Sequence, residues 1–365
     1  MKQVKNKKIN IALIGCGRIS KKHIDAIFAN NKKAQLSCIC DINPKKIDQI
    51  DQYITKIKRK YEEECQSIEK FHSYEDLLFK VKQKEIFLDL IVISTPSGLH
   101  AEQVKLAAKH GINVCTEKPM STNWDDAKSM VSCCDENKVK FFVVKQNRFN
   151  STLQLLKKQI DGGRFGKIAL VSINVFWSRG QDYYDKDEWR GTWEFDGGAL
   201  MNQASHYVDL LTWLIGPVEN IGAKIATIAR NIEVEDTAVL NLKWRNGALG
   251  SMSVTMVTYP NNLEGSITIL GEKGTVKVGG IAVNEIKEWK FSTPSEDDKY
   301  IDQANYNTAN VYGAGHIPYY ANMLDTLLGE AQAICDGREG LKSLELLIGA
   351  YRSAKENNTI NIPLD

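Results

Sequence analysis

Residues 9–20 read Ile-Asn-Ile-Ala-Leu-Ile-Gly-Cys-Gly-Arg-Ile-Ser, and a helical pattern follows them. The apolar run at the start is typical of a buried parallel strand. Gly15 permits a tight turn after this strand, and Gly17 lets the main chain approach a pyrophosphate at the start of the helix. Ser20 replaces the third small residue of the G-x-G-x-x-G fingerprint. The stretch therefore predicts a dinucleotide-binding turn formed by Gly15, Gly17, Arg18 and Ile19.

A second strand is predicted at residues 36–40 and ends in Asp41. An acidic side chain at this point can hold the adenosine ribose 2′-hydroxyl group and would repel a 2′-phosphate, so Asp41 favours NAD over NADP. Aspartate is also a common helix N-cap, and a helix is expected to start near Pro44. A capping role for Asp41 therefore stays open.

The same alternation of strands and helices continues to residue 146. An amphipathic helix over residues 47–61, strands at 88–94, 112–116 and 140–145, and helices at 101–110 and 124–137 are expected. This order predicts a doubly wound parallel sheet in a domain of residues 1–146. The loop at 95–100 lies at the sheet edge where ligands bind, so we assign to the cofactor Ser94, Thr95, Pro96 and His100.

The tripeptide Glu117-Lys118-Pro119 ends the strand predicted at 112–116. The proline biases Lys118 toward an extended conformation, so this lysine lies where a strand stops and its crossover begins. A partly desolvated lysine near a nicotinamide has a lowered pKa and can take a proton from an alcohol. The alternative is an ordinary solvated lysine, and the tripeptide alone does not decide between them.

After residue 146 the pattern changes to strands joined largely by turns. Strands are expected at 168–177, 221–228, 238–244, 249–257 and 264–270, and Asn246-Gly247 is a strong hairpin signal. Helices are expected at 152–159, 203–215, 318–335 and 340–356. We therefore predict a second, α+β domain over residues 147–365, built on a large open and mostly antiparallel sheet.

Composition narrows the class of protein. The chain has 365 residues and a formal net charge of +2, which gives no general reason to expect nucleic acid as a partner. The basic start at residues 1–8 runs directly into a strand, and no apolar stretch reaches membrane-spanning length, so we expect a cytoplasmic protein without a membrane segment.

The eight cysteines show no paired C-x-x-C spacing and the six histidines are scattered, so no metal site is expected. A disulfide between adjacent Cys133 and Cys134 is not expected either.

A second group of polar residues follows Gly197-Gly198. Asn202, His206 and Asp209 recur at four- and three-residue spacing, which places them on one face of a helix, within reach of a substrate. A buried core histidine is the alternative reading of His206.

These motifs together resemble those of the Gfo/Idh/MocA oxidoreductase family, whose members join a Rossmann domain to an open-sheet domain. The resemblance implies that Lys118 of the EKP motif and His206 are the catalytic residues. Asn202 stands where many members have a catalytic aspartate. Proton transfer would therefore depend on Lys118 and His206, with Asn202 orienting the sugar by hydrogen bonds.

Within the family, the chain resembles the WlbA-type UDP-N-acetylglucosaminuronate (UDP-GlcNAcA) 3-dehydrogenases over nearly its full length. The matching stretches are residues 144–148, 189–209, 262–266 and 337–344. The resemblance implies oxidation of the sugar C3 hydroxyl group by NAD⁺ in lipopolysaccharide or O-antigen synthesis. It also implies a pyridoxal-phosphate-dependent aminotransferase as functional partner, and a homodimer or homotetramer.

A UDP-uronate brings a diphosphate and a carboxylate, and the second domain supplies cations for anion pairing at Arg148, Arg164, Lys167, Arg179 and Arg190. Tyr183, Tyr184, Trp189 and Trp193 either stack on the ligand or pack in the core. Arg190 can serve either ligand, because the family's Trp-Arg pair often touches the dinucleotide. To the cofactor we therefore also assign Glu117, Lys118, Gln146, Trp189 and Arg190. To the substrate we assign Lys118, Asn147, Arg148, Arg179, Tyr183, Thr192, Asn202, Gln203, His206, His316 and Tyr320, the last two by resemblance alone.

Two other functions remain open at this stage. One is a different sugar or polyol dehydrogenase or reductase of the same family. The other is a non-catalytic NAD sensor, against which the presence of both Lys118 and His206 argues. The sequence also leaves open whether NADH is released or reoxidised in place by a 2-oxo acid.

Overall fold

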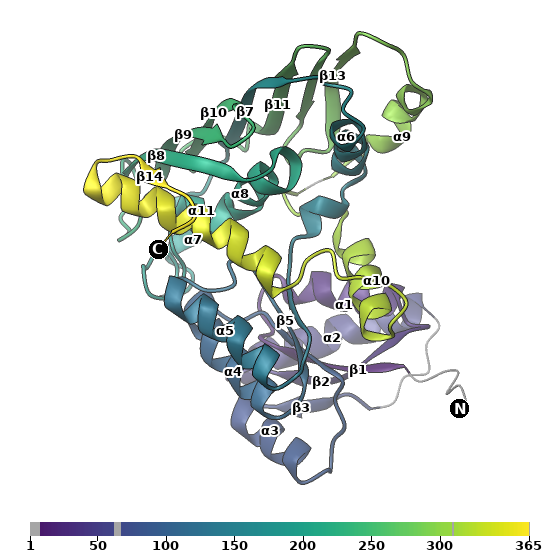
Figure 1. Cartoon of the computed structure of the whole chain (residues 1–365). Helices are drawn as coiled ribbons and strands as arrows, with labels where there is room; N and C mark the ends of the chain where they lie inside the picture. The colour runs from purple at the N-terminus through teal and green to yellow at the C-terminus, as the bar shows by residue number, and fades with distance from the viewer. Residues whose placement is uncertain (1–7, 62–66, 309, 365) are drawn as a thin grey trace. The chain divides into compact units, whose positions relative to one another are not determined.

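The computed structural model describes residues 8–61, 67–308 and 310–364, and Figure 1 traces their path. The chain forms two compact units, one of Met1–Val144 with His316–Leu341 and one of Lys145–Gly315 with Lys342–Asp365. This division differs from the boundary predicted after residue 146, chiefly because His316–Leu341 rejoins the first unit. The basic residues 1–7 and Cys65 lie outside the described residues. The seven described cysteines are all buried, and none of these seven forms a disulfide.

The first unit is built on a six-stranded sheet in the order β3-β2-β1-β4-β5-β6. All its neighbouring strands run parallel. Its strands are β1 (Ile9–Ile14), β2 (Ala34–Cys40), β3 (Glu69–Phe71), β4 (Leu90–Ile93), β5 (Asn113–Thr116) and β6 (Phe141–Val143). The predicted doubly wound parallel sheet is thus confirmed, and its strand order reverses between β1 and β4, where such sheets bind dinucleotides.

Five helices alternate with these strands, namely α1 (Ser20–Ala29), α2 (Pro44–Lys60), α3 (Tyr74–Lys82), α4 (His100–Lys109) and α5 (Trp124–Glu136). α2 buries the isoleucines at positions 47, 50, 54 and 57, as its periodicity predicts. α4 and α5 lie side by side (Figure 1). β3 and α3 were not predicted, because β3 has only three residues and buries only Phe71.

α10 (His316–Leu327) belongs to the first unit although it comes late in the chain. It packs on α1, where the Tyr320 hydroxyl group lies 2.7 Å from Nδ1 of His23. Its neighbour Tyr319 places a hydroxyl group 3.2 Å from Sγ of Cys115 in β5. These buried contacts attach the helix to the first unit. The helix ends at Leu327, so the prediction of a helix up to residue 335 was wrong.

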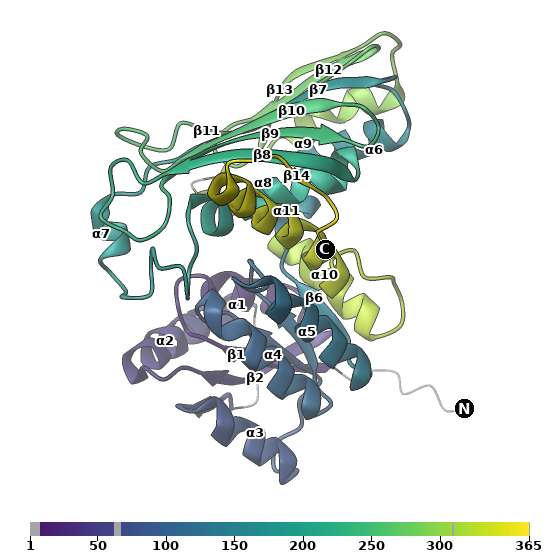
Figure 2. The same ribbon diagram turned by 60° about the vertical axis from the view of Figure 1, so that its left-hand side comes forward.

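The second unit contains an eight-stranded sheet in the order β13-β12-β11-β7-β10-β9-β8-β14, seen nearly edge-on in Figure 2. Only the β7–β10 pair is parallel. Its strands are β7 (Ile168–Phe176), β8 (Val218–Ala226), β9 (Thr237–Trp244), β10 (Leu249–Thr255), β11 (Glu264–Gly271), β12 (Gly274–Gly279), β13 (Glu285–Phe291) and β14 (Ile360–Asn361). The predicted mostly antiparallel sheet is confirmed, although β12, β13 and β14 were not foreseen.

One face of this sheet is covered by helices and forms the core. In β9, Ala238, Leu240, Leu242 and Trp244 are buried, while the residues between them are exposed. The helices of the unit are α6 (Ser151–Asp161), α7 (Gln181–Tyr184), α8 (Ser205–Leu210), α9 (Ile301–Ala304) and α11 (Gly337–Glu356). Figure 2 shows α8 and the later part of α11 on the same side of the sheet.

The helix predicted at 203–215 is not uniform. It consists of a π-helical turn at Ala199–Gln203, the short α8, and a second π-helical turn at Leu211–Ile215. π-turns are frequent at functional sites because they alter where side chains point. Short 3₁₀ segments occur at Ser97–Leu99, Gln146–Phe149 and Glu296–Tyr300. Across the described part of the chain, no helix has the length and apolarity needed to cross a membrane.

Candidate active site

The glycine-rich turn has the geometry that a pyrophosphate requires. Gly15 has φ of +94°, and a Cβ atom there would lie 2.6 Å from the main-chain oxygen of Ser94. A Cβ atom on Gly17 would meet nothing within 4 Å, so the main chain is open to a ligand at this point. Ser20 closes the turn by donating from Oγ to the main-chain oxygen of Gly17 at 2.6 Å. The turn therefore leaves the start of α1 accessible to an anion.

Asp41 lies at the end of β2, half-buried beside this turn. Its Oδ2 accepts from the main-chain nitrogen of Cys16 at 2.8 Å, and its Oδ1 accepts from that of Asn43, also at 2.8 Å. The N-cap of α2 is Asn43, whose side chain accepts from Lys45. The capping interpretation of Asp41 is thus wrong, and its carboxylate, which has further acceptor sites, can also hold a ribose hydroxyl group.

Several side chains that were predicted to contact the cofactor form hydrogen bonds at the edge of the sheet where β4 and β5 end. Ser94 donates from Oγ to the main-chain oxygens of Ile14 and Gly15, at 3.0 and 2.8 Å. Thr95 donates to Gln103 at 2.6 Å. His100 is completely buried, with its two ring nitrogens each 3.0 Å from a main-chain oxygen, one of Thr95 and one of Pro119. We therefore reassign His100 from cofactor contact to fixing the loops that follow β4 and β5.

Glu117 and Lys118 follow β5 directly. Lys118 is half-buried, whereas Glu117 is only 7 % exposed. Oε1 of Glu117 lies 3.1 Å from Nε2 of His23, and its Oε2 accepts from the main-chain nitrogen of Lys118 at 3.0 Å. Burial alone would raise the pKa of Glu117, but His23 and the Lys118 charge hold it well below its usual range. A buried carboxylate thus stands beside the candidate base.

His316 and Tyr320 were predicted to contact substrate, and the structure gives both another role. The Tyr320 side chain is fully buried and its hydroxyl group is bonded to His23. The His316 ring lies edge-on to His23 with 6.0 Å between centroids, and burial lowers its pKa to about 3. Both rings therefore lie against His23 inside the first unit.

In the second unit, His206 is 8 % exposed and its Nε2 lies 2.9 Å from Nε2 of Gln146. Gln146, predicted to touch the cofactor, is thus a direct partner of the candidate catalytic histidine. Asn147 and Gln203 are also buried in this unit.

The charge of Arg148 is paired with a protein carboxylate. Its Nε and Nη2 donate to the two carboxylate oxygens of Asp209, at 2.7 and 2.8 Å, and the side chain is buried. Lys145 lies 3.7 Å from the same carboxylate. Against the effect of burial, Arg148 and Lys145 lower the pKa of Asp209. The predicted substrate cation is therefore a structural partner of the residue one turn after His206. Arg164 is likewise paired with a protein carboxylate, that of Asp298 at 2.8 Å.

Asn202 has an unforeseen neighbour in Asp196. The Asn202 side-chain amide donates to Oδ1 of Asp196, whose Oδ2 accepts from the main-chain nitrogen of Gly191 at 2.8 Å. Asp196 is fully buried. A carboxylate at position 202 would face this carboxylate directly, so the neighbouring aspartate explains why asparagine is stable here.

Arg179 and Arg190 flank the ring of Tyr183, with guanidinium carbons 5.5 and 4.6 Å from its centroid. Arg190 also lies 4.5 Å from the Trp189 ring and donates to the Tyr183 hydroxyl group at 2.8 Å. All four side chains are half-buried. The structure thus brings predicted substrate and cofactor residues into one group, and its two cations suit a diphosphate or carboxylate. Thr192 joins it by donating to the main-chain oxygen of Trp189 at 2.7 Å.

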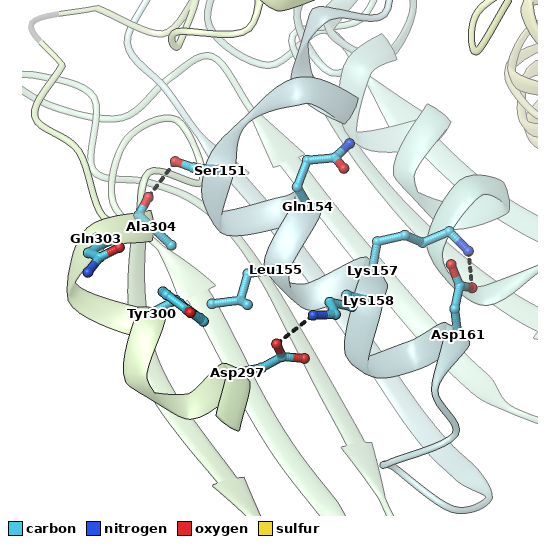
Figure 3. A pocket seen from close by; sticks show the side chains of 10 residues that line it. All are labelled: Ser151, Gln154, Leu155, Lys157, Lys158, Asp161, Asp297, Tyr300, Gln303 and Ala304. Atoms are coloured by element: carbon cyan, nitrogen blue, oxygen red, sulfur yellow. Dashed lines mark hydrogen bonds and ion pairs between the residues drawn. The ribbon is translucent and has the colours of Figure 1, made fainter. Parts of the chain in front are cut away.

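Two of the surface cavities of the described residues lie in the second unit. One of about 660 Å³ includes predicted residues Trp189 and Thr192 and is otherwise lined by Lys186, Asp187, Glu188, Glu194, Phe195 and Glu233. The other, of about 670 Å³, lies between α6 and α9 and is shown in Figure 3. Its cations are paired with acids, Lys158 with Asp297 at 2.6 Å and Lys157 with Asp161. It contains no predicted site residue.

Sequence reasoning missed three buried residues, His23, Asp196 and Glu235. His23 lies in the fingerprint helix and Asp196 beside the double glycine, so position alone could have singled them out. Glu235 carries no local signal. No group of three or more potential metal ligands occurs among the described residues.

Comparison with known proteins decides the family. Residues 9–145 match the model of the oxidoreductase family NAD-binding Rossmann fold, and residues 157–362 match its C-terminal alpha/beta domain. The chain belongs to the GFO/IDH/MocA oxidoreductase family. It is an NAD-dependent oxidoreductase, and the open main chain at Gly17 and the acid at Asp41 fit that cofactor.

Two solved structures are similar over almost the entire chain. The WlbA dehydrogenase of Bordetella pertussis in complex with NADH and UDP-GlcNAcA is 53% identical, with a TM-score of 0.91 and coverage of 99% of this chain and 100% of that one. The WlbA dehydrogenase of Chromobacterium violaceum with the same ligands is 51% identical, with a TM-score of 0.90 and coverage of 99% and 98%. A D-apiose dehydrogenase of Rhizobium rhizogenes is 24% identical over 96% of both chains.

Proposed function

We propose that this protein oxidises the C3 hydroxyl group of UDP-GlcNAcA to the 3-oxo sugar with NAD⁺. The observation that carries the proposal is full-length similarity at 51–53% identity to two WlbA dehydrogenases with NADH and UDP-GlcNAcA bound. The presence of Lys118 and His206 supports an active enzyme rather than an NAD sensor.

In this proposal NAD⁺, when bound, supplies the hydride acceptor. It would be held by Gly15, Gly17, Arg18, Ile19 and Asp41. Lys118 accepts the proton of the sugar hydroxyl group, directly or through His206. Gln146 orients the His206 ring through the contact between their side chains, and Glu117 fixes the main chain at Lys118.

The anionic parts of the substrate are assigned to Arg179 and Arg190, which are half-buried and flank Tyr183. Polar groups of the sugar are assigned to Asn147, Thr192, Asn202 and Gln203. Arg148 is proposed to act indirectly, because its charge is already used by Asp209.

The product would be a substrate for a pyridoxal-phosphate-dependent aminotransferase, which would make a 2,3-diamino uronic acid for lipopolysaccharide, O-antigen or a related surface glycan. We further propose a cytoplasmic homodimer or homotetramer. Mass measurement in solution tests the assembly state, and fractionation of cells tests the location.

The decisive experiment is an assay of NADH formation. The protein is incubated with UDP-GlcNAcA and NAD⁺, the absorbance of NADH is followed, and the sugar product is identified by its mass. A panel of other UDP-sugars, free sugars and polyols tests for a different dehydrogenase of the family. If NADH forms faster with a free polyol than with UDP-GlcNAcA, the substrate proposal is wrong.

The role of Lys118 is tested by Lys118→Ala, which should lower kcat by a factor on the order of 10² to 10⁴ while NAD still binds. Lys128→Ala is the matched control, since Lys128 is an exposed lysine of α5 that contacts Asp125 and the Trp124 ring of the same helix. Near-normal turnover in Lys118→Ala would exclude this lysine as the base.

A further inference from the structure

A buried chain of polar groups leads from α10 through α1 to Glu117. The Tyr320 hydroxyl group lies 2.7 Å from Nδ1 of His23, and Nε2 of the same ring lies 3.1 Å from Oε1 of Glu117. The second carboxylate oxygen of Glu117 accepts from the main-chain nitrogen of Lys118 at 3.0 Å. Both Tyr320 and His23 are completely buried. These groups come from three distant parts of the sequence, and all lie in the first unit.

Donor and acceptor roles along this chain follow from the chemistry of its ends. An ionised carboxylate only accepts, so His23 must carry its proton on Nε2. Nδ1 of the uncharged ring is then an acceptor, and the Tyr320 hydroxyl group donates to it. With its proton on Nε2, the ring suits both of its contacts, the ion-pair contact with Glu117 and the hydrogen bond with Tyr320. The arrangement resembles the way a carboxylate and a histidine orient each other in hydrolytic enzymes.

We propose that His23, itself fixed by Tyr320, is a positioning residue that holds the Glu117 carboxylate and, through it, the main chain of Lys118. This inference rests on the proposed function only in taking Lys118 as the base.

The contacts of His23 and Tyr320 control whether the Glu117 carboxyl group is ionised. Six titratable groups interact electrostatically with the Glu117 carboxylate. They are His23 from α1, His100 from α4, Cys115 from β5, Lys118, and His316 and Tyr320 from α10. His23 and the main chain of Lys118 both contact the carboxylate oxygens. Removing His23 leaves Glu117 buried without its ion-pair partner, which favours the protonated form of the carboxyl group.

A protonated Glu117 has a defined consequence for Lys118. The negative charge of the carboxylate favours the ammonium form of the lysine, and that form cannot accept a proton. Loss of this charge should move the acidic limb of the kcat–pH profile to lower pH. Loss of the hydrogen bond should also loosen Lys118 and lower kcat at its optimum.

Four variants test the proposal. His23→Leu removes the donor to Glu117, whereas His23→Gln can place an amide N–H where Nε2 lies. Tyr320→Phe removes only the hydroxyl group that fixes His23. Tyr319→Phe is the matched control, because Tyr319 is the neighbouring buried tyrosine of α10 and its hydroxyl group lies against Cys115 instead.

We expect His23→Leu to lower kcat about tenfold and Tyr320→Phe about threefold, with KM for NAD⁺ and UDP-GlcNAcA changed less than about twofold. The acidic limb in His23→Leu should move about half a pH unit or more to lower pH. His23→Gln should recover at least about half of the lost kcat, and Tyr319→Phe should match the unaltered protein. Equal losses in His23→Leu and His23→Gln without a pH shift would overturn the proposal, as would equal effects of the two tyrosine variants. If His23→Leu does not fold, the tyrosine pair alone decides.

A second measurement is independent of turnover. In ¹⁵N-histidine NMR spectra of the unaltered protein, the signal that disappears in His23→Gln should carry its proton on Nε2. It should shift in Tyr320→Phe and stay in place in Tyr319→Phe. A proton on Nδ1 alone would exclude the donor chain. If the unaltered protein fails to oxidise UDP-GlcNAcA, the proposed function is wrong, while this spectrum still tests the role of His23.

Discussion

Nε2 of Gln146 lies 2.9 Å from Nε2 of His206, and both side chains are buried in the second unit. An amide nitrogen only donates, so in this arrangement His206 accepts at Nε2 and, when uncharged, carries its proton on Nδ1. A charged His206 would require the Gln146 amide to turn and present its oxygen. The glutamine can therefore serve both protonation states of the histidine.

The first prediction concerns this amide. Gln146→Leu should lower kcat about fivefold, the effect of losing a hydrogen bond worth about 1 kcal/mol. Gln146→Glu should move the acidic limb of the kcat–pH profile to higher pH, since a carboxylate favours charged His206. Gln159→Leu is the control, as Gln159 is a buried glutamine of α6 bonded to Leu155 and Asp297. An unchanged limb in Gln146→Glu would argue against His206 as a proton carrier.

The second prediction concerns cofactor choice. Asp41→Asn keeps an acceptor for only one of the two main-chain nitrogens, those of Cys16 and Asn43, and removes the charge that repels a 2′-phosphate. We expect the ratio of kcat/KM for NAD⁺ to that for NADP⁺ to fall by about tenfold or more. Asn43→Ala, which removes the cap of α2, should cost about 1 kcal/mol of stability and leave the ratio unchanged. A constant ratio in Asp41→Asn would show that another group selects the cofactor.

The third prediction concerns Asn202. Asn202→Asp would place a carboxylate against buried Asp196, so one of the two acids would have a raised pKa in the folded protein. An acid with a raised folded-state pKa destabilises the fold at pH values above that pKa, and the cost disappears below its unfolded value. The variant should therefore lose more thermal stability at pH 8 than at pH 5. Asn202→Ala should lose a similar amount at both, and equal losses for Asn202→Asp would contradict the prediction.

Local sequence patterns predicted much of the fold correctly. The apolar run at 9–14, the glycine turn and the four isoleucines of α2 each predicted an element that the structure contains, because short-range sterics and periodicity determine them. α10 was assigned to the second domain because its position in the chain suggested it. Its true location depends on Tyr319 and Tyr320 meeting Cys115 and His23, which are contacts between distant residues.

In the candidate site, too, contacts between distant residues could not be predicted from the sequence. Motifs identified Asp41, Lys118 and His206, but sequence cannot tell a cation that faces a ligand from one that faces a protein carboxylate. Arg148 and Arg164 were predicted to bind anions, and the structure pairs them with Asp209 and Asp298. Arg179 and Arg190 instead gather around Tyr183. Such pairing depends on which strands and helices meet, so it becomes visible only in the folded chain.

The last prediction concerns Glu235, a buried acid beneath the π-helical turn that carries Asn202. Its Oε1 accepts from the main-chain nitrogen of Leu200 at 2.8 Å and from the Tyr351 hydroxyl group at 3.0 Å. Its Oε2 has no hydrogen-bonding partner among the described residues. A Cβ atom on Gly198 would lie 1.8 Å from this oxygen, so the turn rests directly on the carboxyl group.

Burial raises the pKa of Glu235 to about 7, although the hydrogen bonds from Leu200 and Tyr351 oppose the shift. The folded protein therefore binds a proton that the unfolded chain has already lost between the unfolded pKa and about pH 7. The free energy of unfolding should fall as pH rises through this window, by roughly 3 kcal/mol from this group alone. The full cost is present above the folded pKa.

Glu235→Gln removes the titration while keeping an acceptor for Leu200 and Tyr351. Relative to the unaltered protein, the variant should gain stability steadily from pH 5 to pH 8, as measured by urea unfolding at a series of pH values. Glu233→Gln is the control, because Glu233 is an exposed acid two residues earlier. If the difference between Glu235→Gln and the unaltered protein is the same at pH 5 and pH 8, Glu235 is already ionised in the folded state and the π-helical turn rests on a charged carboxylate.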